Sequence, residues 1–504
     1  MSWKETAEPV LTRMPGVERP EGHVPFRRKL GWTAGILVLY FFLTNVFVYG
    51  LARGQGADAF GQFRTILAGG QGTVLQLGIG PIVTASIVLQ LLGGANLLGL
   101  DTQENPRDQA LYQGLQKLLV IVMCILTGLP MVFAGGFLRA SPQIARQLGI
   151  GLTGVEWLMF LQIFIGGLLI LFMDEVISKW GVGSGIGLFI IAGVSQSLIG
   201  GFFGVPGLTQ NPGFFYNWYT ILTGEQTLGS ILTTQGLLNL LIEPGQILFL
   251  FTTVAIFAVV VYAESVRVEI PLSHARVKGA RGRFPVKLIY ASVLPMILVR
   301  ALQANIQFLG RILYSQAGNA NNAIELFGTS LPWLGVYTTS GGGTAEPIRG
   351  LFYYLAPLYS YQDWMWFLGT TSNPPSQILL RVSVDLFIMV VGGAIFAIFW
   401  VETADMGPEA TAQQIQNSGM QIPGFRQSPG VIEKVLERYI PQVTVIGGAL
   451  VGLLAVMANM LGTIGAVSGT GLLLTVSITY KLYEEIAEEQ LMEMHPMMRQ
   501  VFGD

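Results

Sequence analysis

LGIGPIVTASIVLQLL, residues 77 to 92, is a hydrophobic run whose start is interrupted by Gly78, Gly80 and Pro81. It follows FGQFRTILAGGQGT, residues 60 to 73, which is too polar and too rich in glycine to cross hydrocarbon. Lipid offers no partner for free backbone N–H and C=O groups, so irregular backbone at membrane depth is tolerated only inside protein or along a water-filled cavity. The two stretches therefore predict a re-entrant segment, a broken membrane helix and a cavity. Close packing of Gly and Pro between helices is the alternative.

The composition indicates a membrane protein. Of the 504 residues, 51% are hydrophobic and 12% are charged, about half the charged share of an ordinary soluble domain. A bilayer needs roughly 20 apolar residues per helix. The sequence predicts ten spans, near residues 30–50, 74–93, 116–138, 152–173, 184–203, 245–267, 286–310, 381–401, 441–463 and 465–483. The predicted fold class is an all-α polytopic membrane protein.

The basic residues predict the orientation. Cytoplasmic loops carry an excess of Lys and Arg, and ten spans place twenty of these residues on the side of the N-terminus against six on the other side. We therefore expect a multi-pass protein of the cell membrane with both termini in the cytoplasm. Cys124 lies inside an apolar span and has no second cysteine to pair with, so cysteine usage does not indicate the compartment.

A short motif occurs twice. SGIGL at residues 184–188 opens the fifth span, and SGTGL at residues 468–472 opens the tenth. Five is an odd number, so two five-helix halves would enter the membrane upside down relative to each other, with a pathway at their interface. Chance similarity between glycine-rich spans is the alternative. The predicted organisation is a cytoplasmic arm (1–29), a first half with a plug (30–203, plug 60–72), an outer linker (204–244), a second half (245–486) and a cytoplasmic tail (487–504).

Three loops of the second half stand out. The cytoplasmic loop 268–287 has alternating polarity and basic residues at its tip, and the cytoplasmic loop 402–440 ends in an amphipathic stretch, VIEKVLERYI. The basic tip of loop 268–287 would attract RNA through phosphate contacts, with anionic lipid as the alternative. The outer loop 312–377 is rich in Trp, Tyr and Gly, and we expect a cap that dips partly into the membrane.

Residues that carry chemistry are scarce. No nucleotide-binding phosphate loop occurs, the three histidines lie outside the spans without metal-ligand spacing, and no span offers a histidine base to Ser184 for a serine hydrolase. The sequence predicts no enzyme and no cofactor. Arg300 in the seventh span is a functional candidate by default, and we interpret it as an outer-half arginine that reaches a watery funnel. Asp174, Glu175 and Lys179 predict a solvated, charge-balanced helix end.

Four long motifs resemble the SecY family of protein-translocation channels in its archaeal form. They are LGIGPIVTASIVLQLL, KWGVGSGIGLFIIAGVSQ, YAESVRVEIPLSHARVKGARGRFPVKL and SGTGLLLTVSITYKLYE, within a likeness that runs from about residue 25 to residue 500. The resemblance implies an hourglass of ten helices. It also implies a channel for secretion of unfolded polypeptides across the membrane and for lateral insertion of helices into it.

The same resemblance implies site residues. An aliphatic pore ring falls on Ile79, Val83, Ile186, Ile190, Ile297 and Leu474. A plug beneath the ring falls on Phe60, Phe63, Arg64, Ile66, Leu67, Gly69, Gly70 and Gly72. A lateral gate between spans two and three and spans seven and eight carries Thr84, Gln90 and Asn305. Contacts with the ribosome fall on Arg276, Lys278 and Arg426. Ile190 and Leu474 also agree with the internal repeat, because each lies six residues after the first Ser of its motif.

The implied partners are SecE, a small beta subunit, the ribosome, signal peptides, nascent polypeptides and membrane lipid. Arg300 stands where the family pattern leads us to expect an aliphatic residue. Two other classes compete with the channel. A secondary transporter with inverted repeats needs polar groups at the midplane, whereas the central positions here are aliphatic. A structural scaffold needs neither the broken second helix nor polar gate residues.

Overall fold

The computed structural model describes most of the chain, with gaps. The described residues are all those outside 1–2, 23, 53–63, 95–97, 101–104, 135–136, 207–211, 226–233, 243, 275–280, 290–292, 317–321, 327–328, 340–344, 369–372, 405, 418–419, 422–428, 466 and 495–504.

Each of the ten predicted spans overlaps one long helix. These helices are α2 (Phe26–Leu43), α4 (Gly80–Gly94), α5 (Pro106–Phe133), α7 (Gly151–Trp180), α8 (Gly185–Phe203), α11 (Ile247–Ser265), α12 (Leu294–Gln316), α14 (Pro375–Thr403), α16 (Pro429–Leu461) and α17 (Gly469–Met494). Within the described ranges, six of them (α5, α7, α8, α11, α14 and α16) are long and apolar enough to cross a membrane, and α4 is a shorter apolar helix. The polytopic helical class is confirmed, and the count of ten spans stays a prediction.

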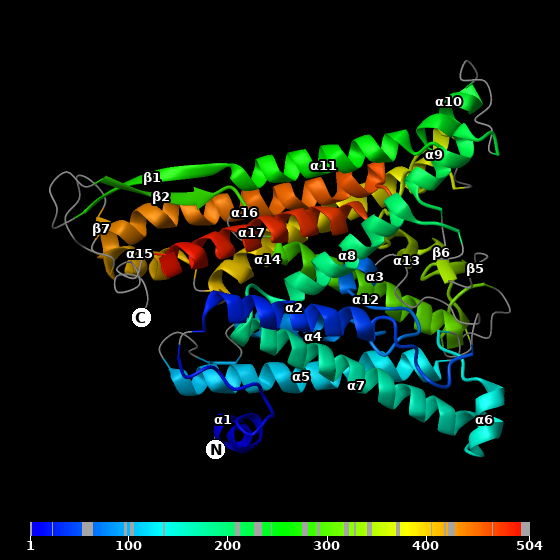
Figure 1. Cartoon of the computed structure of the whole chain (residues 1–504), viewed down its shortest axis with the longest axis horizontal. Helices are drawn as coiled ribbons and strands as arrows, with labels where there is room; N and C mark the ends of the chain where they lie inside the picture. Colours follow the sequence, from blue (N-terminus) through cyan, green and yellow to red (C-terminus); the bar gives the residue numbers. More distant parts are fainter. Residues whose placement is uncertain are drawn as a thin grey trace.

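The long helices form an elongated bundle with two different ends (Figure 1). One end, the sheet end, carries the strands β1 (Arg267–His274), β2 (Arg281–Lys287) and β7 (Met420–Gln421). The opposite end, the cap end, carries the short helices α6 (Pro142–Leu148), α9 (Phe214–Leu222) and α10 (Thr234–Leu241). Helix α1 (Trp3–Leu11) and the last turns of α17 both lie toward the sheet end, as an even number of crossings requires.

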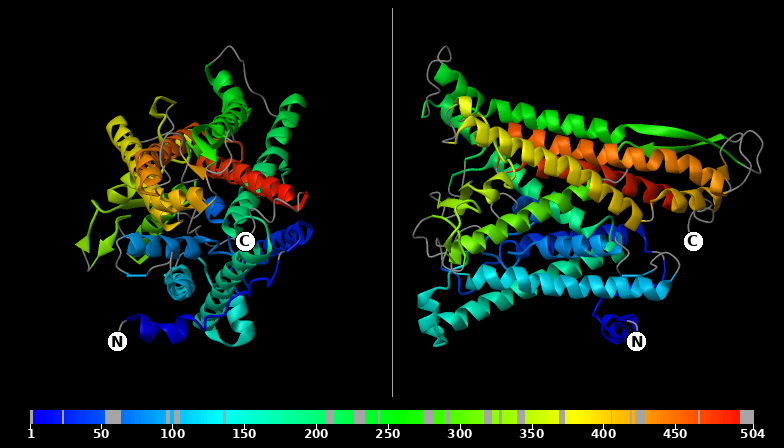
Figure 2. Two further views of the ribbon diagram at one scale, coloured as in Figure 1. Left: turned by 90° about the vertical axis from the view of Figure 1, so that its left-hand side faces the viewer. Right: turned by 180° about the vertical axis from the view of Figure 1, so that it is seen from behind.

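The two halves of the chain lie side by side. Figures 1 and 2 show α2, α4, α5 and α7 on one side of the bundle and α11, α14, α16 and α17 on the other. Helices α8 and α17, which begin at the two related motifs, pack antiparallel: Gly187 near the start of α8 lies against Ile478 of α17, and Gly201 near the end of α8 lies against Gly465, four residues before α17. A Cβ on Gly201 would stand 2.5 Å from the Cα of Gly465, so this crossing requires glycine. The antiparallel pair has the geometry that an inverted repeat predicts.

Several helices extend beyond their predicted apolar spans. Helix α5 begins at Pro106, where the Asn105 side chain accepts a hydrogen bond from the N–H of Arg107, ten residues before the predicted span. Helix α16 begins at Pro429 and absorbs the amphipathic stretch, whose Ile432 and Leu436 are buried against α14 and α15 (Pro408–Asn417). The hydrocarbon thickness sets only the apolar part of a helix, so polar turns can continue it into water.

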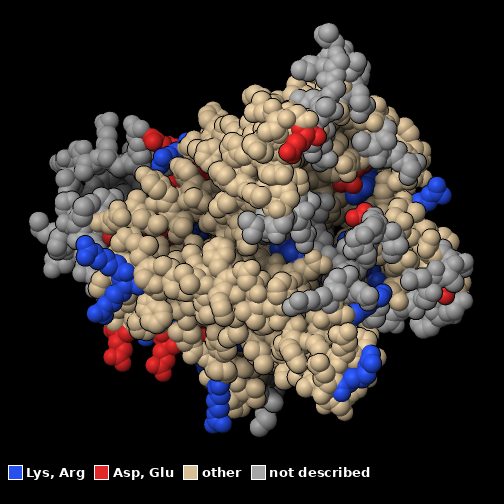
Figure 3. Space-filling model, turned by 45° about the vertical axis from the view of Figure 1, so that its right-hand side comes forward, with Lys and Arg blue, Asp and Glu red and all other residues tan. Residues whose placement is uncertain are grey.

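The rest of the fold is small and lies mainly at the two ends. Strand β1 pairs antiparallel with β2 and with β7. Two hairpins, β3 (Glu325–Leu326) with β4 (Thr329–Ser330) and β5 (Val336–Thr339) with β6 (Ala345–Arg349), belong to the predicted outer cap, together with α13 (Leu351–Tyr354) and the 3-10 turns Tyr361–Asp363 and Trp366–Leu368. Uncharged side chains make up most of the described surface in Figure 3, as expected for a membrane protein.

The N-terminal arm crosses α5 and α7 and is bound to both helices by side chains. Lys4 forms an ion pair with Asp108 at 2.9 Å, and Arg107 pairs with Glu8 and lowers its pKa by donating a hydrogen bond to the carboxylate. Further along, the N–H of Val17 donates to Glu175 at 3.1 Å. The N-terminal arm is therefore fixed to the sheet-end termini of α5 and α7.

Candidate functional site

Side chains of the predicted ring converge from four helices of both halves. Val83 comes from α4, Ile186 and Ile190 from α8, Ile297 from α12 and Leu474 from α17, while Ile79 stands one residue before α4. Ile79, Val83, Ile190, Ile297 and Leu474 belong to one buried hydrophobic cluster, and Ile186 packs against it half-buried. The structure thus brings all six aliphatic residues together, and their role as a pore constriction stays a prediction.

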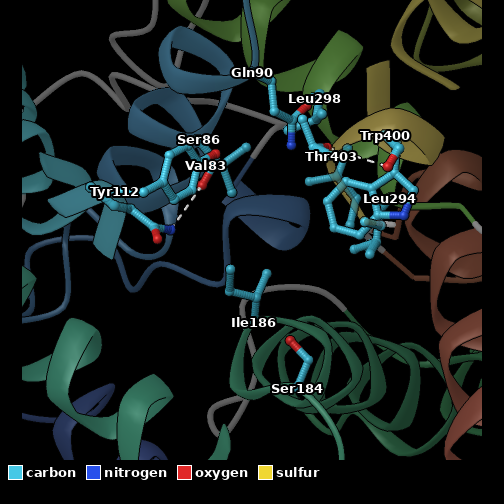
Figure 4. A pocket seen from close by; sticks show the side chains of 13 residues that line it. Val83, Ser86, Gln90, Tyr112, Ser184, Ile186, Leu294, Leu298, Trp400 and Thr403 are labelled. Carbon is cyan, nitrogen blue, oxygen red and sulfur yellow. Dashed lines mark hydrogen bonds between the residues drawn. The ribbon is translucent and has the colours of Figure 1, made fainter. Parts of the chain in front are cut away.

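A cavity of about 280 Å³ opens beside this ring. Its wall includes the ring residues Val83, Ile186 and Ile297, and Figure 4 shows Ser86 and Tyr112 on one side of the space with Leu294 and Trp400 on the other. The lining residues come from α4, α5, α8, α12 and α14, together with Ser184 just before α8 and Ala404 just after α14. The cavity therefore lies between the two halves, next to the aliphatic ring.

The described part of the predicted plug packs against the same cluster. Helix α3 (Arg64–Leu67) places Ile66 and Leu67 in the core, with Ala68 beside them. The carbonyl of Leu67 accepts a hydrogen bond from the N–H of Ile79 at 2.8 Å, and the carbonyl of Ala68 accepts one from the Tyr40 hydroxyl at 3.0 Å. The plug is thus bonded through its backbone to a ring residue.

Glycine allows this close approach. Gly78 has φ +55°, and a Cβ there would stand 2.1 Å from the Leu67 carbonyl oxygen. Gly69, Gly70 and Gly72 lie in the turns that follow α3, where the N–H of Gly72 donates to Gln76 Oε1 at 2.6 Å. The second predicted span therefore starts as a helix only at Gly80. Phe60 and Phe63 lie outside the described residues.

Two of the three predicted gate residues meet. The Asn305 Nδ2 donates to Thr84 Oγ1 at 2.9 Å, which joins α12 of the second half to α4 of the first. Gln90 lies six residues after Thr84 on α4 and lines the cavity instead, with its side-chain oxygen buried and without a hydrogen bond among the described residues. The structure therefore pairs Thr84 with Asn305 and leaves Gln90 apart.

The interpretation of Arg300 was wrong. Its side chain is 1% exposed and forms an ion pair with Asp385 of α14 at 3.2 Å, so it does not reach a watery funnel. Gln303 Nε2 donates to the same carboxylate oxygen at 3.0 Å, and the N–H of Leu358 donates to the other oxygen at 3.3 Å. This buried network fixes α12 to α14 and to the segment that follows α13.

Asp174 also differs from its prediction. Its carboxylate accepts a hydrogen bond from the N–H of Ile186 at 2.9 Å and so caps the start of α8, which carries two ring residues. Glu175 pairs with Lys117 at 2.7 Å and with Lys179 at 3.0 Å. The acidic end of α7 therefore positions α8 and α5 rather than serving only as a solvated terminus.

The predicted docking residues Arg276, Lys278 and Arg426 lie outside the described residues. The strands that flank them join the two loops, because Ser273 pairs with Gln421 and His274 with Met420. At the base of the sheet, Lys287 forms an ion pair with Glu484 of α17 and lies 5.9 Å from the centre of the Tyr480 ring. The two loops are thus joined into one unit that contacts a helix of the ring.

The family model for SecY matches residues 73–483, and a model for the plug domain of Sec61p matches residues 38–72. The chain belongs to the SecY family. The protein translocase subunit SecY of Haloarcula marismortui is 72% identical over 100% of both chains, and that of Methanocaldococcus jannaschii is 40% identical over 98% of this chain and 99% of the relative.

Solved structures agree with the SecY assignment. A protein-conducting channel superimposes with a TM-score of 0.76 at 38% identity, covering 97% of this chain and 98% of the other. Sec61 in a canine ribosome-channel complex from the endoplasmic reticulum gives 0.73 at 38% identity over the same shares. The predicted function as a subunit of a protein-translocation channel is confirmed at the level of the family, and the secondary transporter is not supported.

Proposed function

We propose that this chain forms a pore through which unfolded polypeptides cross the cell membrane, and from which hydrophobic helices pass sideways into lipid. One observation carries the proposal: aliphatic side chains from both halves meet in one cluster, with a cavity on one side and the plug bonded to Ile79. Polypeptides of any sequence can pass such a ring, because it makes no side-chain-specific contact.

The ring and plug form the proposed seal. An aliphatic constriction offers an ion no substitute for its hydration shell and can close by dewetting. Exchanges among Ile, Leu, Val and Met should therefore keep the channel tight, whereas Ser or Gly at several ring positions should conduct ions at rest. Deleting residues 60–72 removes the second barrier and should cause intermittent leak while translocation continues.

Conductance of the purified complex in planar bilayers tests this proposal. Plug deletion combined with polar ring substitutions should leak more than either change alone. The matched control exchanges Ile79 and Ile190 for Leu, which keeps apolar bulk and should leave the resting channel closed. A tight resting channel in the combined variant would place the seal elsewhere.

The seam between α4 and α12 is the proposed lateral gate. The Asn305–Thr84 hydrogen bond across it joins two neutral groups, and such a bond contributes only about 1 kcal/mol. The Arg300–Asp385 pair on the other side of α12 is buried and charged, and breaking a pair of this kind costs roughly 3–5 kcal/mol. The weaker seam should open, with α12 and α14 moving as one body.

Orientation and partners complete the proposal. The excess of basic residues supports an orientation with the sheet end and both termini in the cytoplasm and the cap end outside. Loops 268–287 and 402–440 would then meet ribosomal RNA through Arg276, Lys278 and Arg426, and the joined strands support a common docking surface. SecE and a small beta subunit would complete a heterotrimer. Co-purification of ribosomes and two small single-span subunits tests these partners.

A further inference from the structure

Helix α9, within the segment predicted only as an outer linker, exposes apolar side chains and buries polar ones. Phe215, Tyr219 and Leu222 are 52%, 59% and 81% exposed, and their spacing of four and three residues places them on one face of the helix. The two polar residues of α9, Asn217 and Thr220, are instead buried. In water an amphipathic helix buries its apolar face, so this arrangement indicates that the exposed face of α9 lies in an apolar environment.

The exposed face of α9 continues the exposed apolar side of α8. Helix α8 is long and apolar enough to cross a membrane, and its Ile199 and Phe203 are exposed. The ring of Phe203 lies 5.1 Å from the ring of Phe215, so the exposed apolar side of α8 leads directly onto α9. The sequence carries no charged residue from position 180 to position 224.

Helix α9 is held firmly at this position. The Trp218 indole N–H donates to the carbonyl of Gly245, just before α11, at 3.0 Å. The N–H of Gly213 donates to the carbonyl of Gly204, at the end of α8, at 2.8 Å. The exposed apolar face is therefore presented at a fixed level, at the cap end of two long helices (Figure 1).

We propose that α9 lies in the membrane interface, with Phe215, Tyr219 and Leu222 inserted into lipid. Tyr and Trp are enriched where a membrane meets water, because their rings are apolar and their tips are polar, and α9 contains Tyr216, Trp218 and Tyr219. Continuity with α8 favours lipid over a protein partner. The choice of the outer leaflet rests on the proposed orientation, while contact with lipid does not.

Spin labels in the reconstituted complex test the proposal. A nitroxide is attached to Leu222→Cys or Phe215→Cys in vesicles of phosphatidylcholine and phosphatidylglycerol, and its collisions with oxygen and with a water-soluble nickel chelate are measured. Ile199→Cys on α8 gives the lipid reference, and Glu346→Cys on the exposed strand β6 gives the water reference. Cys124 is buried and serves as the unlabelled background.

The labels on α9 should collide with oxygen more than with the nickel chelate, as the Ile199 label does. A ratio like that of the Glu346 label would show that α9 faces water and would overturn the proposal. Low accessibility to both reagents would show that protein covers α9, which also overturns it. The measurement needs no translocation activity, so its result is independent of the proposed channel function.

Discussion

Removing Asp385 should destabilise the protein strongly, because it leaves a buried charge without its partner. The carboxylate accepts hydrogen bonds from Arg300, Gln303 and the backbone of Leu358. After Asp385→Leu, the Arg300 guanidinium keeps only the Gln303 side-chain oxygen among its described partners. Breaking a buried ion pair from one side costs about 3–5 kcal/mol, and this variant should lie at the upper end of that range.

The reverse change should cost less. After Arg300→Met, Asp385 still accepts hydrogen bonds from Gln303 and Leu358, so its charge remains partly compensated. The double variant, Arg300→Met with Asp385→Leu, removes both charges and should recover most of the lost stability, since apolar replacements of buried pairs are often neutral or stabilising. A double-mutant cycle should therefore give a coupling energy of at least about 2 kcal/mol.

Cys124 provides the assay. It is the single cysteine of the chain and is fully buried, so its reaction with a thiol-reactive fluorophore reports unfolding in detergent without any introduced cysteine. Ser383→Ala, on the exposed face of the same helix, is the matched control and should melt like the unchanged protein. Additive losses in the double variant, or a harmless Asp385→Leu, would refute the claim that this pair fixes α12 to α14.

Three further predictions concern the plug, the docking loops and the topology. Gly78→Ala forces a Cβ against the Leu67 carbonyl and should raise the resting ion conductance of the complex. Gly80→Ala makes only ordinary contacts at 3.8 Å and should not raise it. Equal conductance of the two variants would show that the contact between the plug and Gly78 does not contribute to the seal. Substitution of Arg276, Lys278 and Arg426 by Glu should weaken ribosome binding in sedimentation and make it less dependent on salt concentration. The control Arg13→Glu should change neither. Unchanged binding of the triple variant at moderate salt would show that the ribosome docks on other residues. Cysteines at Ala280 and Gly342 should react with an impermeant reagent from opposite faces of the membrane, and labelling of both from one side would contradict the predicted orientation.

Local features of the fold could be predicted from the sequence. The SGxG motifs place the starts of α8 and α17, because Ser184 and Ser468 stand immediately before these helices. The broken beginning of the second span is confirmed, since irregular backbone needs Gly78 and the Leu67 carbonyl at close range. Both features depend on backbone geometry within a few residues, which a glycine pattern encodes directly.

Contacts between distant residues could not be predicted in the same way. Asp385 lies 85 residues from Arg300, and no periodicity in either span indicates that the two face each other. An acidic residue inside the eighth predicted span was the available signal, because a charge at membrane depth requires a partner. The capping of α8 by Asp174 was missed for a related reason, since the turn between α7 and α8 brings the carboxylate back onto Ile186.

A polypeptide that passes through the aliphatic ring must come within reach of the ring side chains, and site-specific crosslinking measures this contact. A photoreactive amino acid replaces Leu474 or Ile190 in the ring, or Leu161 on the exposed outer side of α7, and a secretory polypeptide is stalled during translocation. Crosslinks to the stalled chain should form from both ring positions and not from Leu161. Crosslinks from Leu161 with none from the ring would contradict passage through the ring.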